Sequence, residues 1–469
     1  MTAKRAVLVG AITSLVAVLF LWRPVLAKDT KHHDDDKGSD AGGPPQFTVD
    51  PSWPQPLPST VDANGVAHRW VLGEVAASCI DANDNVVTFN RGWQVGVTFN
   101  GVTHGAQSGA IVAQDAAASA IPSPPVVIFN RAGKVIAGWG DPSLIQPPDP
   151  SYGGAAVLPH GAHGCFVDFE GNVWLGGNGD GIVQKYSASG ALLLTIGKKG
   201  LCDGPPDNTT IAGANVFPTC GEAKDFNSSH TLLNEPADIA VDPDVGPISH
   251  KRGDVYIAEG YGNHRVVVFD RDGTFLTQFG KSCGHNGADC PDGTFGATGG
   301  GHPHCVTLGN DGLVYACDRP NSRIQAFDKQ GNWQRTIPIE PSPMASAPDQ
   351  AAILKAGTRA CDMDFWPNVD YLAGFSPKSQ RFIIDVDLGN DNTWILEKAS
   401  GTTVGALGRC GLMPCPGHNA GEFAFGHTTA TDSHGDVYVA ETITGRRIQK
   451  FVRERDHQND GDHQNDGDH

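Results

Sequence analysis

One motif recurs along this chain and limits the folds that are open to it. It consists of an apolar stretch, a turn of the Asp-x-x-Gly type, a second apolar stretch similar to VYVA, a polar loop, and a third stretch similar to RIQAF. Clear copies begin at His163, Pro236, Pro303 and Gly426, a degenerate copy begins at Leu72, and the weakest copy spans 361–408. Alternating apolar residues bounded by turn residues predict β-strands. Each copy therefore predicts several short antiparallel strands.

The number of copies predicts the architecture. Six copies lie between about Trp53 and Val452, and three of the four clear ones continue through a further turn into a fourth strand. Four-stranded units repeated radially form a β-propeller. The 59 Gly and 32 Pro residues favour such a turn-rich chain. We predict an all-β fold, a six-bladed β-propeller, whose units resemble NHL repeats.

The two ends of the chain differ from the repeats. Lys4 and Arg5 precede an apolar run that ends near Trp22, and PVLA ends at Ala27. This pattern indicates a secretory signal cleaved after Ala27, or an uncleaved signal anchor. We expect four segments: a signal peptide or anchor over 1–27, a disordered linker over 28–52, the propeller over 53–452, and a disordered acidic, His-containing tail over 453–469.

Charge and cysteine content indicate the compartment and the partners. The net charge of −18 argues against a nucleic-acid partner, because no phosphate-neutralising surface is evident. An exported chain with 11 Cys is expected to form disulfides and to be secreted or periplasmic, with membrane contact only through an uncleaved anchor. Local bridges are plausible for three pairs, although the spacing leaves connectivity open: Cys202/Cys220, Cys283/Cys290 and Cys410/Cys415.

Three histidines share one position in the repeat. His163, His304 and His427 each stand at the entry to the innermost strand of a copy, in the second, fourth and sixth copies. Alternate blades of six lie about 120° apart, so the three imidazoles would converge on the channel axis. A His₃ set with an open position is typical of catalytic zinc, and iron(II), cobalt or manganese would also suit imidazole. The alternative is that each histidine only packs or caps. We interpret His160, His264 and His302 as loop residues.

Three further side chains lie in loops expected at the same end of the channel. Tyr261 follows the second strand of the third copy, while Arg319 and Arg91 follow the second strands of the fourth and first copies. Arginine binds carboxylates with bidentate geometry. A tyrosine near a dication and a guanidinium is favoured as phenolate and would serve as a general base. The alternative is ordinary packing for the tyrosine and pairing with an acid such as Asp318 for an arginine.

These segments resemble the peptidyl-α-hydroxyglycine α-amidating lyases, which are NHL-type six-bladed propellers. The resemblance covers about 72–451 and is strongest in EGYGNHRVVVFDRDGTFLTQFG and PHCVTLGNDGLVYACDRPNSRIQAF. It implies that His163, His304 and His427 are zinc ligands. It also implies that Tyr261 is the catalytic tyrosine and that Arg91 and Arg319 are active-site arginines.

The chain departs from that family at several positions. An Asp that helps to hold structural calcium in the lyases is Thr428 here, and the backbone carbonyls of the same site align near Ser78 and Cys165, so calcium binding stays open. Gly262 and Ala326 stand where the animal lyases have cysteines, so the disulfide pattern must differ.

The resemblance and the residues together predict an enzyme. We expect a metal-dependent carbon–nitrogen lyase that cleaves an N-acyl- or peptidyl-α-hydroxyglycine, a substrate with a free carboxylate, to an amide and glyoxylate. One alternative is a non-catalytic extracytoplasmic propeller that binds a protein or glycan. Another is a calcium-dependent, lactonase-like hydrolase, but such sites use carboxylates and Asn where this repeat has His.

Overall fold

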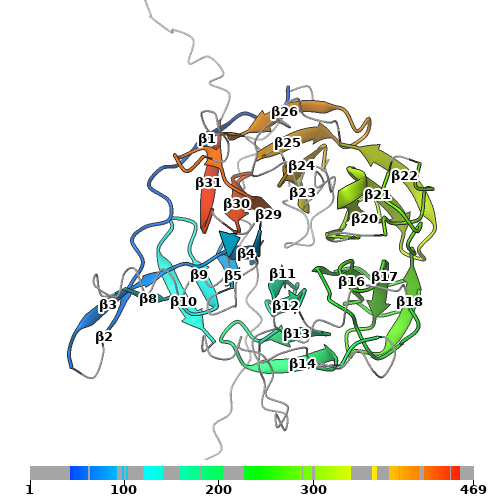
Figure 1. Ribbon diagram of the computed structural model, residues 1–469, viewed down its shortest axis with the longest axis horizontal. Coiled ribbons are helices and arrows are strands. Elements are labelled where there is room, and N and C mark those ends of the chain that lie inside the picture. The colour runs from blue at the N-terminus through cyan, green and yellow to red at the C-terminus, as the bar shows by residue number, and fades with distance from the viewer. Residues whose placement is uncertain are drawn as a thin grey trace, which may run out of the picture. The chain divides into compact units, whose positions relative to one another are not determined.

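The computed structural model describes one compact unit after residue 43. It covers residues 43–61, 64–91, 98–99, 102–103, 120–140, 158–159, 161–179, 181–199, 201–203, 227–287, 289–297, 302–339, 362–366, 380–389, 391–410, 417–443 and 445–454. Six four-stranded antiparallel sheets stand around a central channel (Figure 1). The predicted all-β, six-bladed propeller is therefore confirmed.

Blades 1 to 3 follow the order of the chain. Blade 1 contains β4 (Val75–Ile80), β5 (Val86–Asn90), β9 (Val126–Phe129) and β10 (Val135–Trp139). Blade 2 contains β11 (Ala162–Val167), β12 (Val173–Gly177), β13 (Ile182–Tyr186) and β14 (Leu192–Gly197). Blade 3 contains β15 (Asp238–Val241), β16 (Val255–Glu259), β17 (Arg265–Phe269) and β18 (Phe275–Phe279). In each blade the first strand is the innermost one.

Blades 4 to 6 complete the ring. Blade 4 contains β19 (Val306–Leu308), β20 (Leu313–Asp318), β21 (Arg323–Asp328) and β22 (Trp333–Pro338), with the 3-10 turn η4 (Arg319–Asn321) after β20. Blade 5 contains β23 (Asp362–Trp366), β24 (Phe382–Asp387), β25 (Asn392–Glu397) and β26 (Thr403–Leu407). Blade 6 contains β29 (Gly426–Thr431), β30 (Val437–Glu441), β31 (Arg447–Arg453) and β1 (Phe47–Val49).

Strand β1 closes the ring and corrects two predicted boundaries. It pairs with β31, Phe47 opposite Arg453 and Val49 opposite Phe451. Residues 47–49 therefore belong to the propeller and not to a linker over 28–52, and Arg453 belongs to β31 and not to the tail. The physical reason is that the outermost edge of blade 6 gains hydrogen bonds from a strand at the other end of the chain. The signal, the start of the linker and residues 455–469 lie outside the described residues.

The repeated motif forms the turns and the core. In the Asp-x-x-Gly turns the aspartate accepts backbone N–H groups two and four residues later, as Asp270 does from Asp272 and Thr274 at 3.0 and 2.8 Å. The turn glycine, Gly273 in this copy, has φ of 85°, which favours glycine. The aromatic residue of the second strand is at most 1% exposed in four blades, as Trp174, Tyr256, Tyr315 and Tyr438. Burying such a side chain contributes about 1.5–3 kcal/mol.

Smaller sheets are present besides the six blades. The hairpin β2 (Ser59–Val61) and β3 (Ala67–Val71), with β8 (Ala120–Pro122) parallel to β3, projects at the left of Figure 1. Two short pairs, β6 (Thr98–Phe99) with β7 (Val102–Thr103) and β27 (Arg409–Cys410) with β28 (Glu422–Phe423), complete the described strands.

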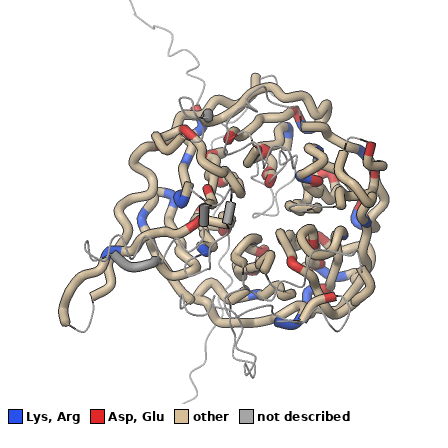
Figure 2. The backbone as a smooth tube through the Cα atoms, in the orientation of Figure 1, with Lys and Arg blue, Asp and Glu red and all other residues tan. Residues whose placement is uncertain are grey.

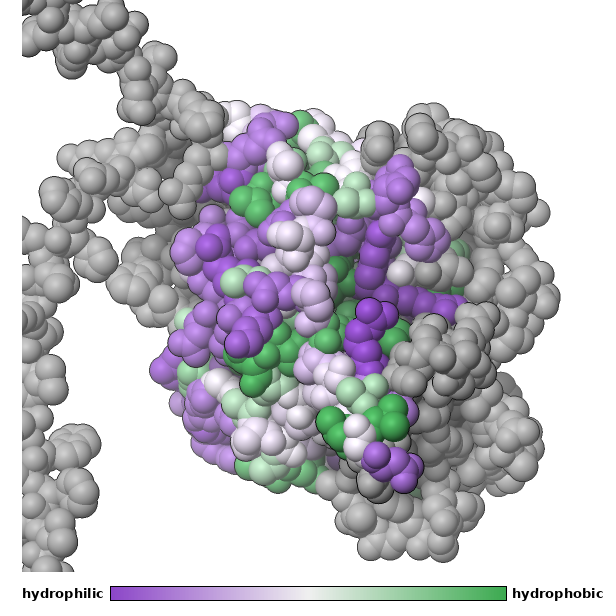
Figure 3. Space-filling view, turned by 90° about the vertical axis from the view of Figure 1, so that its left-hand side faces the viewer, coloured by the Kyte–Doolittle hydropathy of each residue, from purple (hydrophilic) through white to green (hydrophobic). Residues whose placement is uncertain are grey.

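The surface carries both signs of charge. Acidic and basic residues are distributed around the ring (Figure 2). The face that lies at the left of Figure 1 mixes hydrophilic and separate apolar groups (Figure 3). Within the described residues no helix is long and apolar enough to cross a membrane.

Candidate metal centre

Three imidazoles meet at one end of the channel. His163 lies near the start of β11, His304 two residues before β19, and His427 near the start of β29, in blades 2, 4 and 6. One ligand nitrogen from each lies within 4.8 Å of the others, and their side chains are buried. The ring centroids lie 4.5–5.2 Å apart. The structure therefore brings together the three residues that the repeat predicted to converge; that they bind a metal stays a prediction.

Backbone carbonyls of the intervening blades orient two of these rings. His163 Nδ1 lies 2.7 Å from the carbonyl oxygen of Ala237 in blade 3, and His427 Nδ1 lies 2.6 Å from that of Ala76 in blade 1. A proton on Nδ1 donates to the carbonyl and leaves the Nε2 lone pair for a ligand, which is the arrangement metal-binding histidines usually have. These carbonyl acceptors favour the tautomer of His163 and of His427 that carries its proton on Nδ1.

Electrostatics keep the same two rings neutral. Burial lowers the pKa of His163 well below its usual value, and His427 and the nearby Arg91 guanidinium lower it further. Burial, Arg91 and Arg319 likewise lower the pKa of His427. A neutral imidazole is the form that coordinates a metal. Burial, and to a smaller extent the arginines, therefore favour the neutral rings that can coordinate a metal.

Tyr261 points at the histidines. Its hydroxyl lies 3.0 Å from Nε2 of His163 and 3.0 Å from Nε2 of His304. The flanking glycines of EGYGN make this approach sterically possible: a Cβ on Gly260 would lie 1.9 Å from the Pro303 carbonyl oxygen, and one on Gly262 would lie 2.0 Å from Asn234 Oδ1. The loop thus packs tightly and holds the phenol at the tripod.

Arg91 is held from three sides. Its Nη1 donates to Glu74 Oε2 at 2.8 Å and to Thr442 Oγ1 at 3.2 Å, and its Nε donates to the Ala162 carbonyl oxygen at 3.0 Å. Thr442 Oγ1 also donates to Glu74 Oε2 at 2.8 Å. Nη2 makes no hydrogen bond to the described part of the chain, so of the three guanidinium nitrogens it is the one left to donate to a ligand. Sequence reasoning missed Glu74 and Thr442, because the contact joins blade 1 to blade 6.

Arg319 lies against the tyrosine. Its guanidinium carbon is 5.7 Å from the centre of the Tyr261 ring, and the residue is 6% exposed. The neighbouring Asp318 carboxylate accepts Arg323 Nε at 2.7 Å, and its other oxygen lies 3.0 Å from His302 Nδ1. Asp318 is therefore a buried structural group, fully engaged below the loop that carries Arg319.

His302 and His264 lie in loops, as the sequence indicated, but both are buried. His302 is 0% exposed and His264 is 3% exposed, with ring centroids 5.9 Å apart. His160 lies outside the described residues.

The sequence does contain a pattern that could have predicted the buried position of Asp318. In three blades an acidic residue at the end of the second strand pairs with an arginine at the start of the third strand. The pairs are Glu259 and Arg265, Asp318 and Arg323, and Glu441 and Arg447.

The disulfides agree with one predicted bridge and add two. Cys283–Cys290 is present as predicted. Cys79–Cys165 joins blades 1 and 2, and Cys305–Cys317 joins the residue just before β19 to β20, next to His304; neither was predicted. Cys202 is also disulfide-bonded, but Cys220 and Cys415 lie outside the described residues. The two unpredicted bridges brace the inner strands near the tripod.

The position that carries an acid in the lyases has a different role here. Thr428 Oγ1 accepts a hydrogen bond from the Ser78 backbone N–H at 3.0 Å, which links blade 6 to blade 1. A hydroxyl engaged in this way supplies no carboxylate, so residue 428 does not fit the acidic calcium ligand that the resemblance implied.

Comparison with known proteins agrees with this fold. The NHL repeat family matches residues 301–327. NHL repeat-containing protein 3 of Homo sapiens is 25% identical over 340 residues, which cover 70% of this chain and 73% of that protein. The probable peptidyl-alpha-hydroxyglycine alpha-amidating lyase of Caenorhabditis elegans is 23% identical over 331 residues, 69% of this chain and 74% of that protein. Peptidyl-alpha-hydroxyglycine alpha-amidating lyase 1 of Drosophila melanogaster is 27% identical over 319 residues, 63% of this chain and 47% of that protein.

The fold and the repeat define the class: the chain is a six-bladed β-propeller with an NHL repeat. Within that class it is similar, at low identity, to proteins named as amidating lyases and equally to a protein named only for its repeats.

Proposed function

We propose that this protein is a metal-dependent carbon–nitrogen lyase acting on N-acyl- or peptidyl-α-hydroxyglycines. The observation that carries the proposal is the Tyr261 hydroxyl, 3.0 Å from Nε2 of both His163 and His304. A phenol held at these nitrogens lies where a general base for a metal-bound substrate would have to lie. The low-identity relatives named as lyases support the same reading.

The His₃ set suits zinc, iron(II) or another divalent transition metal, held by His163, His304 and His427. When bound, such a dication supplies Lewis-acid chemistry that makes a nearby hydroxyl easier to deprotonate. Arg319 beside the Tyr261 ring adds positive charge that favours the phenolate.

Tyr261 is the proposed general base. As phenolate, its Oη accepts the proton of the substrate α-hydroxyl. The oxygen electrons then form the aldehyde C=O of glyoxylate, the C–N bond breaks, and its electron pair leaves on the amide nitrogen. The phenol returns the proton to that nitrogen, which gives the primary amide. The O–H and C–N bonds are broken and the C=O π bond and an N–H bond are formed, so the step needs no oxidant or reductant.

Arg91 is the proposed carboxylate anchor. Glu74, Thr442 and the Ala162 carbonyl engage Nη1 and Nε, so Nη2 is the nitrogen that would donate to the carboxylate of the substrate. A guanidinium fixed by three partners loses little freedom on binding, which favours affinity.

The second candidate is a binding propeller without catalysis, which the similarity to NHL repeat-containing protein 3 favours. Metal analysis of the purified chain, combined with glyoxylate release from α-hydroxyhippurate, separates the two. Near-stoichiometric transition metal with metal-dependent glyoxylate release is expected of the lyase. A chain that binds no transition metal and releases no glyoxylate would be the binding module.

We also propose that the chain works outside the cytoplasm. Three disulfides are described in full, and such bonds are typical of oxidising compartments. Cell fractionation with sequencing of the mature N-terminus tests this proposal and the predicted cleavage after Ala27.

A further inference from the structure

One buried carboxylate closes the turn that carries Arg319. Asp318 ends β20, is 0% exposed, and stands directly before Arg319 in the chain. Its Oδ2 accepts a hydrogen bond from Asn321 Nδ2 at 2.8 Å, at the end of η4, and one from Arg323 Nε at 2.7 Å, at the start of β21. Because these contacts span the turn, the direction in which Arg319 leaves η4 depends on where the carboxylate lies.

The imidazole of His302 holds the other oxygen of this carboxylate. His302 is 0% exposed, and its Nδ1 donates to Asp318 Oδ1 at 3.0 Å, where the Gly296 N–H also donates at 3.0 Å. The backbone N–H of His302 donates to the Gly260 carbonyl oxygen at 2.8 Å, directly before Tyr261. Hydrogen bonds between buried groups and a carboxylate are among the strong ones. His302 therefore connects the tyrosine loop to the carboxylate that closes η4.

Blades 3 and 6 close the same end of the sheet without a histidine. Their second strands end in a glutamate whose carboxylate accepts a backbone N–H from the segment before the inner strand. The pairs are Glu259 with Asn234 and Glu441 with Ala424. In blade 4 the acid is an aspartate, which is one methylene shorter, and an imidazole from the segment before β19 reaches it. The side-chain link therefore belongs to the blade whose following turn carries Arg319.

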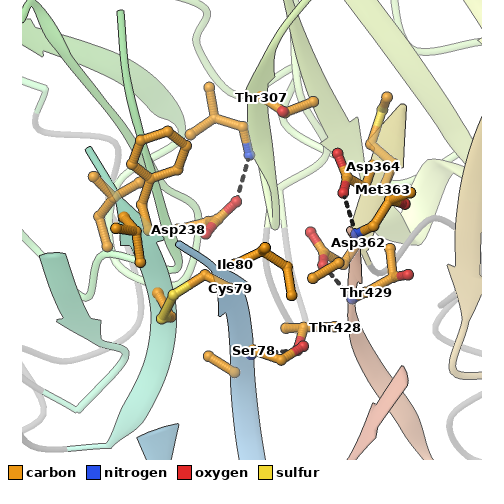
Figure 4. A pocket seen from close by; sticks show the side chains of 18 of the residues that line it. Ser78, Cys79, Ile80, Asp238, Thr307, Asp362, Met363, Asp364, Thr428 and Thr429 are labelled. Carbon is orange, nitrogen blue, oxygen red and sulfur yellow. Dashed lines mark hydrogen bonds between the residues drawn. A yellow bond between two sulfur atoms is a disulfide. The ribbon is translucent and has the colours of Figure 1, made fainter. Parts of the chain in front are cut away.

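His304 is held in place without the His302 side chain. Its backbone N–H donates to the Cys317 carbonyl oxygen at 2.8 Å, and the residue after it is disulfide-bonded to the same Cys317. On the channel side, the Val306 N–H donates to Asp238 Oδ2 at 3.0 Å (Figure 4). Burial raises the pKa of Asp238 to about 7, but the carboxyl can accept this N–H in either protonation state. A variant of His302 should therefore leave the proposed metal ligand where it is.

We propose that His302 is a positioning residue that acts through Asp318 on Arg319. The inference rests on the proposed function, in which the Arg319 guanidinium, 5.7 Å from the centre of the Tyr261 ring, favours the phenolate. Without the imidazole, Asp318 loses one of its donors and no longer fixes η4. The guanidinium is then released from the ring, whereas the metal and the Arg91 anchor remain.

The test is a double-mutant cycle in the full chain with its transition metal bound. His302→Phe keeps an aromatic ring and removes the donor, so kcat for α-hydroxyhippurate should fall about tenfold or more, as expected for the loss of a charged hydrogen bond. KM should change by less than about threefold and metal content should stay native. His302→Asn places an amide N–H near the position of Nδ1 and should restore most of kcat. In an Arg319→Gln background, His302→Phe should have little further effect, because the group through which it acts is gone.

Trp174→Phe is the matched control. It also removes a buried hydrogen bond to an aspartate, from Trp174 Nε1 to Asp168 Oδ2 at 2.9 Å, but at the end of β11 opposite His163. We expect it to lower Tm by a similar amount and to leave kcat and KM native. Native kcat in His302→Phe, or the same loss of kcat with and without Arg319, would overturn the positioning role.

Two other results are also decisive. If His302→Phe does not fold, His302→Gln replaces it in the cycle, with the same expectation, because its longer amide places the donor near Nε2 and away from Asp318. If the wild-type chain releases no glyoxylate, the proposed function fails, and crystal structures of wild type and His302→Phe then test the positioning alone. A guanidinium of Arg319 displaced from the Tyr261 ring in the variant would support it, and an unmoved one would overturn it.

Discussion

Blades 2, 4 and 6 differ from blades 3 and 5 at the point where their inner strands enter the channel. The first set presents His163, His304 and His427, and the second presents Ala237 followed by Asp238, and Asp362. Imidazoles suit a transition metal, whereas carboxylates suit a hard cation. Three blades of the sixfold repeat thus carry imidazoles at the mouth of the channel, and two others carry carboxylates deeper in it.

Removing a ligand from the histidine set gives the largest expected effect. His304→Ala should abolish glyoxylate release and leave the purified chain without stoichiometric transition metal, since two imidazoles remain of three. Inductively coupled plasma mass spectrometry measures the metal, and circular dichroism checks the fold. Full metal content in this variant would place the metal elsewhere.

Removing the proposed general base, Tyr261, should reduce turnover almost as much but leave the metal bound. Tyr261→Phe removes only the hydroxyl, so we expect turnover to fall by about 10²–10⁴-fold while metal content stays native. Steady-state kinetics on α-hydroxyhippurate measures it. Near-native turnover with metal bound would exclude the phenolate mechanism and would leave metal-bound hydroxide to be examined as the base.

Weakening the hydrogen bonds that hold Arg91 should have a smaller effect on kinetics, and this effect should depend on the substrate. Glu74→Gln weakens a charged hydrogen bond to Arg91, and such bonds contribute about 1.5–3 kcal/mol. We expect KM for carboxylate-bearing substrates to rise about tenfold or more with a smaller change in kcat. Arg91→Lys should act in the same direction, because the charge remains without the planar fork. An equal loss with a substrate amide in place of the carboxylate would show that Arg91 does not bind that group.

Replacing the carboxylates of Asp238 and Asp362 should give the smallest effect, a change in how the free energy of unfolding depends on pH. The folded-state pKa of Asp238, about 7, exceeds its ordinary value of 3.8, so the folded chain retains a proton that the unfolded chain loses. The free energy of unfolding should therefore fall as pH rises from about 4 to 7. Comparing denaturant titrations of wild type with Asp238→Asn/Asp362→Asn isolates this contribution. A double variant with the same pH slope would contradict it.

The repeat made the fold and the tripod predictable, because each histidine keeps a fixed position relative to a strand that recurs. Contacts between different copies of the repeat could not be predicted in this way. Cys79 and Cys165 pair across 86 residues, and Glu74 meets Thr442 from the other end of the chain. The burial of His302 depends on Asp318 beneath a loop. Spacing within one repeat carries no information about which repeats become neighbours.

The pairing of β1 with β31 has a consequence for how the chain is made. Phe47–Val49 is synthesised before any other strand of the ring, yet its partner, Arg447–Arg453, is synthesised last. Joining segments so far apart costs loop-closure entropy that grows with the logarithm of their separation. The first strand of the ring to leave the ribosome must therefore wait without its partner until the strands of all six blades have been synthesised.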